Sequence, residues 1–147
     1  MTISSKPKRV KIFHSDLTIT AVFKGNRKKA RSSVENWNNH RILMRNNKTK
    51  QQSSFDFWGS IEHPEIKSKK RLLKVFIRFV SHAISGEYDL YEFCNKSGYG
   101  DADIGKAHRV WRMCQRHNAK LKKVYDGDMR DLLNDLKQME VQNNAGS

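Results

Sequence analysis

The sequence predicts an α+β fold that is mainly helical, with a short N-terminal strand or hairpin followed by a helical domain. Two observations support this fold class. β-Branched and aromatic residues are dense between Val10 and Phe23, as is typical of strands. From residue 67 onwards, apolar residues recur at spacings of three and four, as is typical of helices. We therefore divide the chain into a basic N-terminal region, residues 1–54, and a helical domain, residues 55–147.

The N-terminal region is expected to contain the β element and one helix. Residues 1–9 are polar and basic and predict a leading arm. The segment Val10–Phe23 has a polar break in its middle, so we expect either one strand or a hairpin. A capping-box pattern at Ser32–Glu35 predicts a helix from about Ser33 to Arg45. The polar residues 46–54 then predict a linker or an exposed loop.

The helical domain begins with Phe55–Trp58, whose alternating pattern predicts a short strand. The apolar stripe over residues 67–84 is too wide for a surface helix and predicts a central buried helix. A short helix is expected over Leu90–Lys96 and a longer basic helix over Ile104–Lys123. The last helix should run from about Asp128, its cap, to Val141.

The charge of the chain is strongly basic and unevenly distributed. Its 147 residues include 29 Lys and Arg against 15 Asp and Glu, a formal net charge of +14. Residues 24–50 contain nine basic residues and one acidic residue, and residues 104–125 contain seven basic residues and no acidic residue. Residues 126–140 reverse the sign, with five acidic and two basic residues. Because a basic surface attracts phosphates and releases their counterions, nucleic acid is the expected partner.

The stretch Leu90–Arg109 resembles the helix-turn-helix of DNA-binding proteins. That motif needs a small residue on its first helix, a glycine in the turn and an apolar residue on its second helix. Cys94, Gly98 and Ile104 stand at these three places. The resemblance implies that the helical domain contains a helix-turn-helix whose recognition helix begins near Gly100. It also implies internal contacts by four residues: Phe93, Tyr99, Ile104 and Ala107.

Two sets of residues are candidate DNA contacts. In the implied recognition helix, Asp101 could accept a hydrogen bond from a cytosine amino group, although we favour the interpretation that Asp101 and Asp103 cap the helix. The basic residues that follow recur mostly at spacings of three or four, which places them on one helix face. Those residues are Lys106, Arg109, Arg112, Arg116, Lys120 and Lys123. The second set, expected to contact phosphate or the minor groove, is Lys28, Lys29 and Arg31.

These patterns predict a DNA-binding protein, a small transcriptional regulator or an accessory factor of a phage or mobile element, which docks a basic recognition helix on duplex DNA. Two alternatives stay open. A nuclease, or an accessory subunit of one, would need a carboxylate cluster or a histidine–metal site. The segment with Glu62, His63, Glu65 and Lys67 contains an E-x-K motif, but no matching upstream acid in a strand accompanies it. An RNA-binding or ribonucleoprotein-inhibiting module would use the same basic surface on RNA instead of DNA.

No enzyme activity, cofactor or metal is expected. The residues Cys94, His108, Cys114 and His117 lack the paired spacing of zinc ligands, so we interpret the cysteines as core thiols. The sequence has no secretory signal and no apolar stretch near the roughly 20 residues that span a bilayer. We therefore expect a cytoplasmic protein that does not bind membranes.

The last predicted helix also bears on oligomeric state. Its apolar residues fall at heptad spacing, which suits packing either on the core or against a second copy in a homodimer. These residues are Met129, Leu132, Leu136 and Met139.

Overall fold

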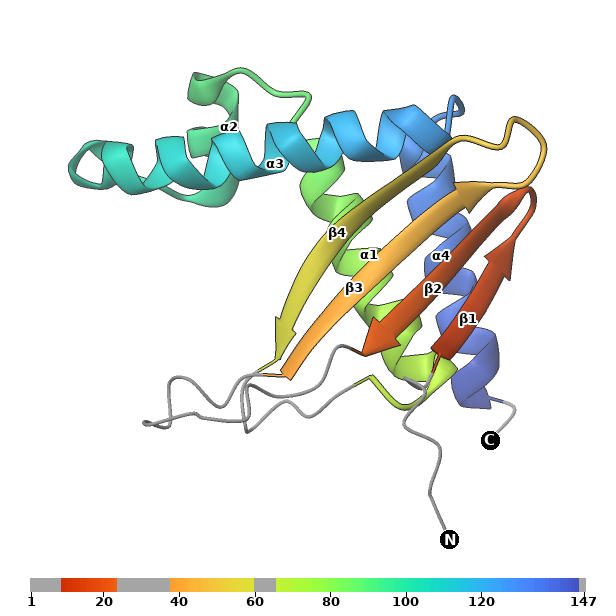
Figure 1. The fold of residues 1–147 in the computed structure, drawn as a ribbon. Helices are drawn as coiled ribbons and strands as arrows, with labels where there is room; N and C mark the ends of the chain where they lie inside the picture. Colours follow the sequence, from red (N-terminus) through yellow and green to blue (C-terminus); the bar gives the residue numbers. More distant parts are fainter. Residues whose placement is uncertain (1–8, 24–37, 60–65, 146–147) are drawn as a thin grey trace, which may run out of the picture. The chain divides into compact units, whose positions relative to one another are not determined.

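The computed structural model describes residues 9–23, 38–59 and 66–145 (Figure 1). Contacts divide the chain into two compact units, Met1–Leu72 and Leu73–Ser147, and the division lies within helix α1 (Lys69–Ser85). Strands come first and helices follow, which confirms the α+β, mainly helical fold class. The boundary predicted after residue 54 falls inside strand β4 (Gln52–Gly59).

The first unit contains a four-stranded antiparallel sheet whose strands lie side by side in sequence order (Figure 1). Strands β1 (Arg9–His14) and β2 (Leu17–Phe23) form a hairpin, which is one of the two alternatives that the sequence leaves open over residues 10–23. Strand β3 (Asn38–Asn46) pairs with both β2 and β4. The polar segment predicted as a loop supplies the turn between β3 and β4, although its last three residues belong to β4.

The helix predicted over residues 33–45 is wrong where the structure describes that segment. Residues from Asn38 onwards form β3, and the capping-box residues lie outside the described part of the chain. The alternating residues His40, Ile42 and Met44 are all at most 1% exposed, which is a strand period rather than a helix period. Because β3 pairs with a strand on each side, its backbone N–H and C=O groups form hydrogen bonds in both directions. The free energy of this pairing outweighs a local preference for helix.

Burial of alternate residues gives the sheet one inner face. Ile12, Ile19 and Met44 are partners across β1, β2 and β3, and none of them is more than 6% exposed. His40 belongs to the same face, and its Nε2 accepts a hydrogen bond of 2.8 Å from the backbone N–H of Ile66. This bond fixes the segment that leads into α1, because a buried imidazole nitrogen needs a partner.

The second unit holds the remainder of α1 and three further helices, α2 (Leu90–Ser97), α3 (Ile104–Val124) and α4 (Met129–Ala145). All four helices predicted for this region are confirmed, with ends within a few residues of the expected ones. The wide apolar stripe of α1 is buried, with Phe76 and Val80 fully inaccessible. Among the described helices, none combines the length and the apolar character that crossing a membrane requires.

Two contacts of α1 set the position of α3. The side-chain Nδ2 of Asn118 donates a 2.7 Å hydrogen bond to the carbonyl of Ala83 in a buried environment. Gly86 follows directly after α1, and a Cβ at this position would lie 2.3 Å from the carbonyl oxygen of Cys114. A side chain at position 86 would therefore push the α3 backbone away.

Candidate nucleic-acid interface

Helix α3 has an inner side that is packed and an outer side that is basic. The inner side includes Ala107, Cys114 and Leu121, all 1% exposed or less. Trp111 is partly buried, and its indole N–H donates a 2.8 Å hydrogen bond to the carbonyl of Tyr88. Trp111 therefore packs on the inner side of α3. Cys114 also lies inward, and burial raises the pKa of its thiol, so that it stays protonated at neutral pH.

The six basic residues predicted on one face of this helix do share that face. At 3.6 residues per turn their positions fall within an arc of about 120°, opposite the buried side. Five of them are exposed and Lys120 is half-buried. We call this set the α3 basic face: Lys106, Arg109, Arg112, Arg116, Lys120 and Lys123.

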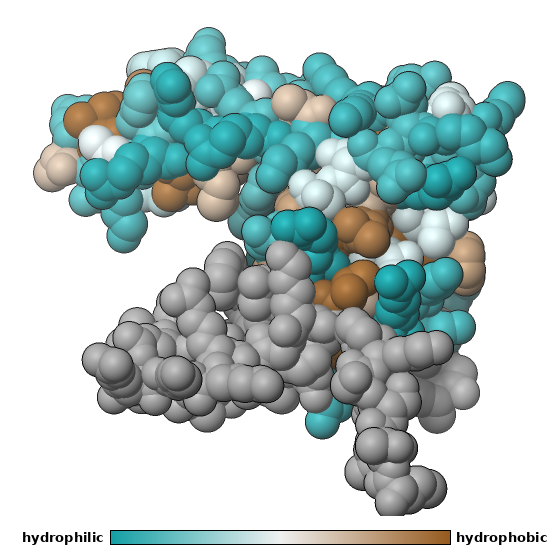
Figure 2. All heavy atoms as spheres, viewed as in Figure 1, coloured by the Kyte–Doolittle hydropathy of each residue, from teal (hydrophilic) through white to brown (hydrophobic). Residues whose placement is uncertain are grey.

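No acidic residue interrupts this face, since the whole of α3 lacks Asp and Glu. The positive charge is therefore not cancelled by neighbours on the same helix. Figure 2 shows that the visible side of α3 is mostly hydrophilic. Such a surface is suited to a polyanion because each phosphate it neutralises releases a counterion.

The connection between α2 and α3 has several features of the helix-turn-helix that the sequence resembles. Asp89 caps α2 by accepting a 2.8 Å hydrogen bond from the backbone N–H of Glu92. Gly98 ends α2 in the left-handed conformation, with φ 76°, as a turn glycine would. Phe93 and Ala107 are buried in one cluster, against which Tyr99 packs at a ring distance of 6.0 Å from Phe93.

Other features of this connection differ from the sequence-based predictions. Ile104 is 51% exposed, so it is not the internal contact that locks the two helices; Ala107, one turn later, takes that place. The long helix begins at Ile104, as its periodicity predicts, and not near Gly100, as the motif resemblance implies, because residues Asp101–Asp103 form a separate 3-10 turn. A short turn of this type commonly precedes an α-helix and rotates the side chains that follow it.

The two aspartates of this turn do not cap by their side chains. Asp103 occupies the N-cap position of α3 but makes no side-chain hydrogen bond there. The N-cap residue of the 3-10 turn is Gly100, which has no side chain to make one. Asp101 is exposed. Both carboxylates lie near the helix N-terminus, where the helix dipole favours negative charge. The prediction that these aspartates cap the helix is therefore wrong as far as side-chain hydrogen bonds are concerned.

The other candidate residues lie outside the described parts of the chain. Lys28, Lys29 and Arg31 fall between β2 and β3 in the sequence, within residues 24–37, so their predicted contacts with DNA stay a prediction. The same holds for Glu62, His63 and Glu65 of the nuclease alternative. Among the residues that the structure does describe, no group of three or more His, Cys, Asp or Glu side chains is placed to hold a metal ion.

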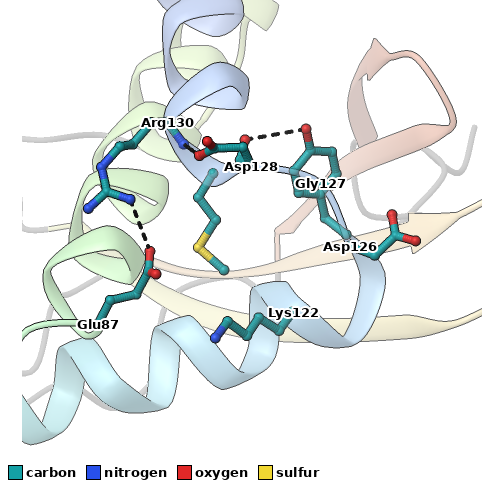
Figure 3. Close-up of a pocket in the computed structure, with 8 residues that line it drawn as sticks. Glu87, Lys122, Asp126, Gly127, Asp128 and Arg130 are labelled. Carbon is teal, nitrogen blue, oxygen red and sulfur yellow. Dashed lines mark hydrogen bonds and ion pairs between the residues drawn. The ribbon is translucent and has the colours of Figure 1, made fainter.

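The turn between α3 and α4 lines a pocket of about 470 Å³ that carries both signs of charge (Figure 3). Arg130 pairs with Glu87 at 3.7 Å, and the Asp128 carboxylate accepts from the Arg130 backbone N–H at 2.8 Å. Burial, and then the neighbouring aspartates, raise the pKa of Tyr125 above its usual value. This negative field makes the turn a poor surface for phosphate, so the basic face ends here.

Two histidines form a partly buried pair between α1 and α3. The rings of His82 and His117 are stacked with their centres 5.8 Å apart, and His117 also contacts Phe79. Burial, followed by the charges of His82, Lys120 and Arg116, lowers the pKa of His117 to about 4. Burial and then Arg78 lower the pKa of His82. Both rings are therefore neutral at pH 7, and neither adds charge to the basic face.

The apolar stripe of α4 is largely used inside the chain. Met129, Leu132 and Leu136 are at most 4% exposed. A homodimer through this helix stays a prediction. It would need to use positions outside this stripe, such as Val141, which is 65% exposed.

A second basic surface was missed by the sequence analysis. The strand face opposite the buried one carries Arg9 and Lys11 on β1 and Arg41 and Arg45 on β3. The alternation of basic and apolar residues in Arg9–Ile12 could have revealed the part on β1. On β3, the helix prediction concealed that Arg41 and Arg45, with Leu43 between them, share one strand face.

Searches of protein-family models, of curated proteins and of solved structures found no match for this chain.

Proposed function

We propose that this chain binds duplex DNA through the α3 basic face. The observation that carries the proposal is the division of α3 into a packed side and an uninterrupted basic side with no acidic residue. The setting predicted from the sequence, a small transcriptional regulator or an accessory factor of a phage or mobile element, stays a prediction.

The dimensions of the helix support duplex DNA as the ligand. The 21 residues of α3 span about 30 Å, and the basic face extends over about 25 Å of that length. One turn of duplex DNA repeats at about 34 Å, so a helix of this length meets phosphates on both sides of a major groove. In this arrangement Lys106 and Arg109, near the helix start, lie closest to the bases, and Arg112 and Arg116 meet the backbone.

The test begins with selection of bound sequences from random duplex DNA in the presence of an RNA competitor. Binding of each variant to the selected site and to a scrambled duplex is then measured by fluorescence anisotropy. Arg109→Ala should weaken binding to the selected site by about 1–3 kcal/mol and weaken binding to the scrambled duplex less. Arg112→Ala and Arg116→Ala should weaken binding to both duplexes about equally.

Lys122→Ala is the matched control, because Lys122 lies on the same helix but lines the pocket at the α3–α4 turn (Figure 3). This variant loses the same charge and should bind both duplexes within about twofold of wild type. Unchanged binding of the Arg112 and Arg116 variants would contradict the proposal. Tighter binding of RNA, or metal-dependent cleavage of the duplex, would instead support the RNA-binding or the nuclease alternative.

A further inference from the structure

The sheet of the first unit has an outer face that the α3 proposal does not use. Cross-strand partners place Phe13, Thr18 and Arg45 in one row of this face, and Lys11, Thr20 and Leu43 in the next. A third row contains Arg9, Val22 and Arg41. We call these nine residues the open sheet face. Eight of them are partly or fully exposed and alternate with the buried residues of the same strands, as the strand period requires, whereas Thr20, on the central strand, is only 8% exposed.

The open sheet face is positively charged. It carries Arg9, Lys11, Arg41 and Arg45, of which Arg45 is partly buried and the others are exposed. One acidic residue on the adjacent strand β4, Asp56, pairs with Arg41 at 3.6 Å, and both side chains are about half exposed. This surface is therefore electrostatically complementary to an anionic partner.

The shape of this face follows from which strand carries which side chains. The long basic side chains are on β1 and β3, whereas β2 between them presents the shorter Thr18, Thr20 and Val22. Two strand spacings separate β1 from β3, a distance of about 10 Å. The major groove of duplex DNA is about 12 Å wide, so Arg and Lys side chains that extend from β1 and β3 at this spacing would reach the phosphates on its two edges.

Phe13 adds an apolar group to this basic surface. Its ring is 58% exposed, which is unusual for a phenylalanine, and it stands in the same row as Thr18 and Arg45. Apolar side chains contact thymine methyl groups in the major groove. Figure 2 shows hydrophilic and hydrophobic residues intermixed where the strands are visible.

We propose that the open sheet face is a second DNA-contacting surface, which enters a major groove with Phe13 and Thr18 towards the bases and with the basic residues of β1 and β3 on the phosphates. This proposal rests on the proposed function in one respect, namely that the ligand is duplex DNA. The major groove of duplex RNA is deep and narrow, so the same face does not fit it.

The test compares paired charge removals on each surface of the full chain, using a fluorescent duplex of the selected sequence over a range of salt concentrations. Lys11→Gln with Arg45→Gln should weaken binding about tenfold or more at physiological salt and reduce the salt slope by about two. The charge-preserving pair Lys11→Arg with Arg45→Lys should restore binding. Phe13→Ala should weaken binding about fivefold while the salt slope stays unchanged, since no charge is lost.

The matched control removes two exposed charges of the first unit that are off this face. Lys48 is in the turn between β3 and β4, and Lys70 is in the first turn of α1. Lys48→Gln with Lys70→Gln should bind as wild type does. Far-ultraviolet circular dichroism and thermal melting of every variant establish that the sheet is intact, and the charge-preserving pair keeps the comparison informative if the neutral pair melts early.

The outcomes separate this proposal from the one for α3. Normal binding by the Lys11 and Arg45 neutral pair, with weakened binding by Arg112→Gln and Arg116→Gln, would overturn the sheet proposal and leave the α3 proposal standing. Weakened binding by the sheet pair, with normal binding by the α3 pair, would support the sheet proposal and overturn the one for α3. Equal or tighter binding of a duplex RNA of the same sequence would overturn the sheet proposal, because its geometry excludes that groove.

Discussion

Two glycines of this protein are favoured for different physical reasons, and each reason concerns the Cβ atom that glycine lacks. Gly98 has φ 76°, and nothing lies within 4 Å of the place that a Cβ would occupy. Space is therefore available there, and only the backbone conformation favours glycine. Gly86 is the opposite case, since its Cβ would collide with the backbone of α3. The same residue type thus serves two different physical requirements within one unit.

Replacement of Gly98 tests the first of these requirements. Gly98→Ala should lower the free energy of unfolding by about 1 kcal/mol, because a Cβ is disfavoured in the left-handed region. Gly98→Asn should lose less, since asparagine enters that region more readily than alanine. Urea denaturation of both variants measures the difference. Equal stability of the alanine variant and wild type would contradict the left-handed assignment.

The histidine pair predicts a pH dependence of stability. His117 titrates near pH 4 in the folded state and near 6.5 when exposed, and the pKa of His82 is lowered in the same direction. Below pH 6.5 the unfolded chain therefore binds more protons than the folded chain, so stability should fall as the pH drops from about 6.5 towards 4. Above pH 6.5 these two groups should have no effect on stability.

Thermal melting from pH 4 to pH 8 measures this dependence. His117→Gln should flatten the slope below pH 6.5, because the variant has lost the titrating group. His108→Gln is the control for loss of one histidine from an exposed position on the same helix. An unchanged slope in His117→Gln would show that this pair is not its source.

At the scale of elements, α2 and α3 are joined by contacts that differ from those of the motif they resemble. The buried cluster around Phe93 and Ala107 holds the two helices, and Ile104 lies outside it. Between them the 3-10 turn at Asp101–Asp103 delays the start of α3 by one turn. The turn at Gly98 and the buried Phe93 agree with what the resemblance implies, whereas the second helix begins at Ile104 and not near Gly100.

Two aspartate substitutions distinguish these contacts. Ala107→Asp should lower the free energy of unfolding by about 3 kcal/mol or more, because it places a carboxylate in a fully buried position. Ile104→Asp should change it by about 0.5 kcal/mol or less, because position 104 is exposed and at a helix N-terminus. Chemical denaturation of both variants measures the two changes. A large loss in Ile104→Asp would mean that this side chain is internal after all.

At the scale of the whole molecule, the net charge of +14 predicts an interaction that depends strongly on salt. If each of the six residues of the α3 basic face neutralises one phosphate, the logarithm of the binding constant should fall against the logarithm of salt concentration with a slope of about −5. Contacts from the open sheet face would make that slope steeper.

Anisotropy titrations at several salt concentrations measure this slope. Arg112→Ala should reduce its magnitude by about one, and Lys122→Ala, off the basic face, should leave it unchanged. Binding that is nearly independent of salt would contradict phosphate contacts as the source of affinity.

The sequence by itself determined much of this protein. The helices over residues 69–145, the strand character of residues 9–23 and the basic face of α3 all follow from patterns that a single segment contains. A helix face is a property of one element, because side chains three and four residues apart share it whatever the rest of the chain does.

The tertiary structure decided the features that depend on partners distant in sequence. Residues 38–46 became a strand because β2 and β4 pair with them, although their local pattern also suited a helix. The open sheet face exists only once β1, β2 and β3 are in register, since its basic residues come from segments about 30 residues apart. Ile104 is exposed although it is apolar, because it is the first residue of α3 and the packing against α2 begins one turn later, at Ala107.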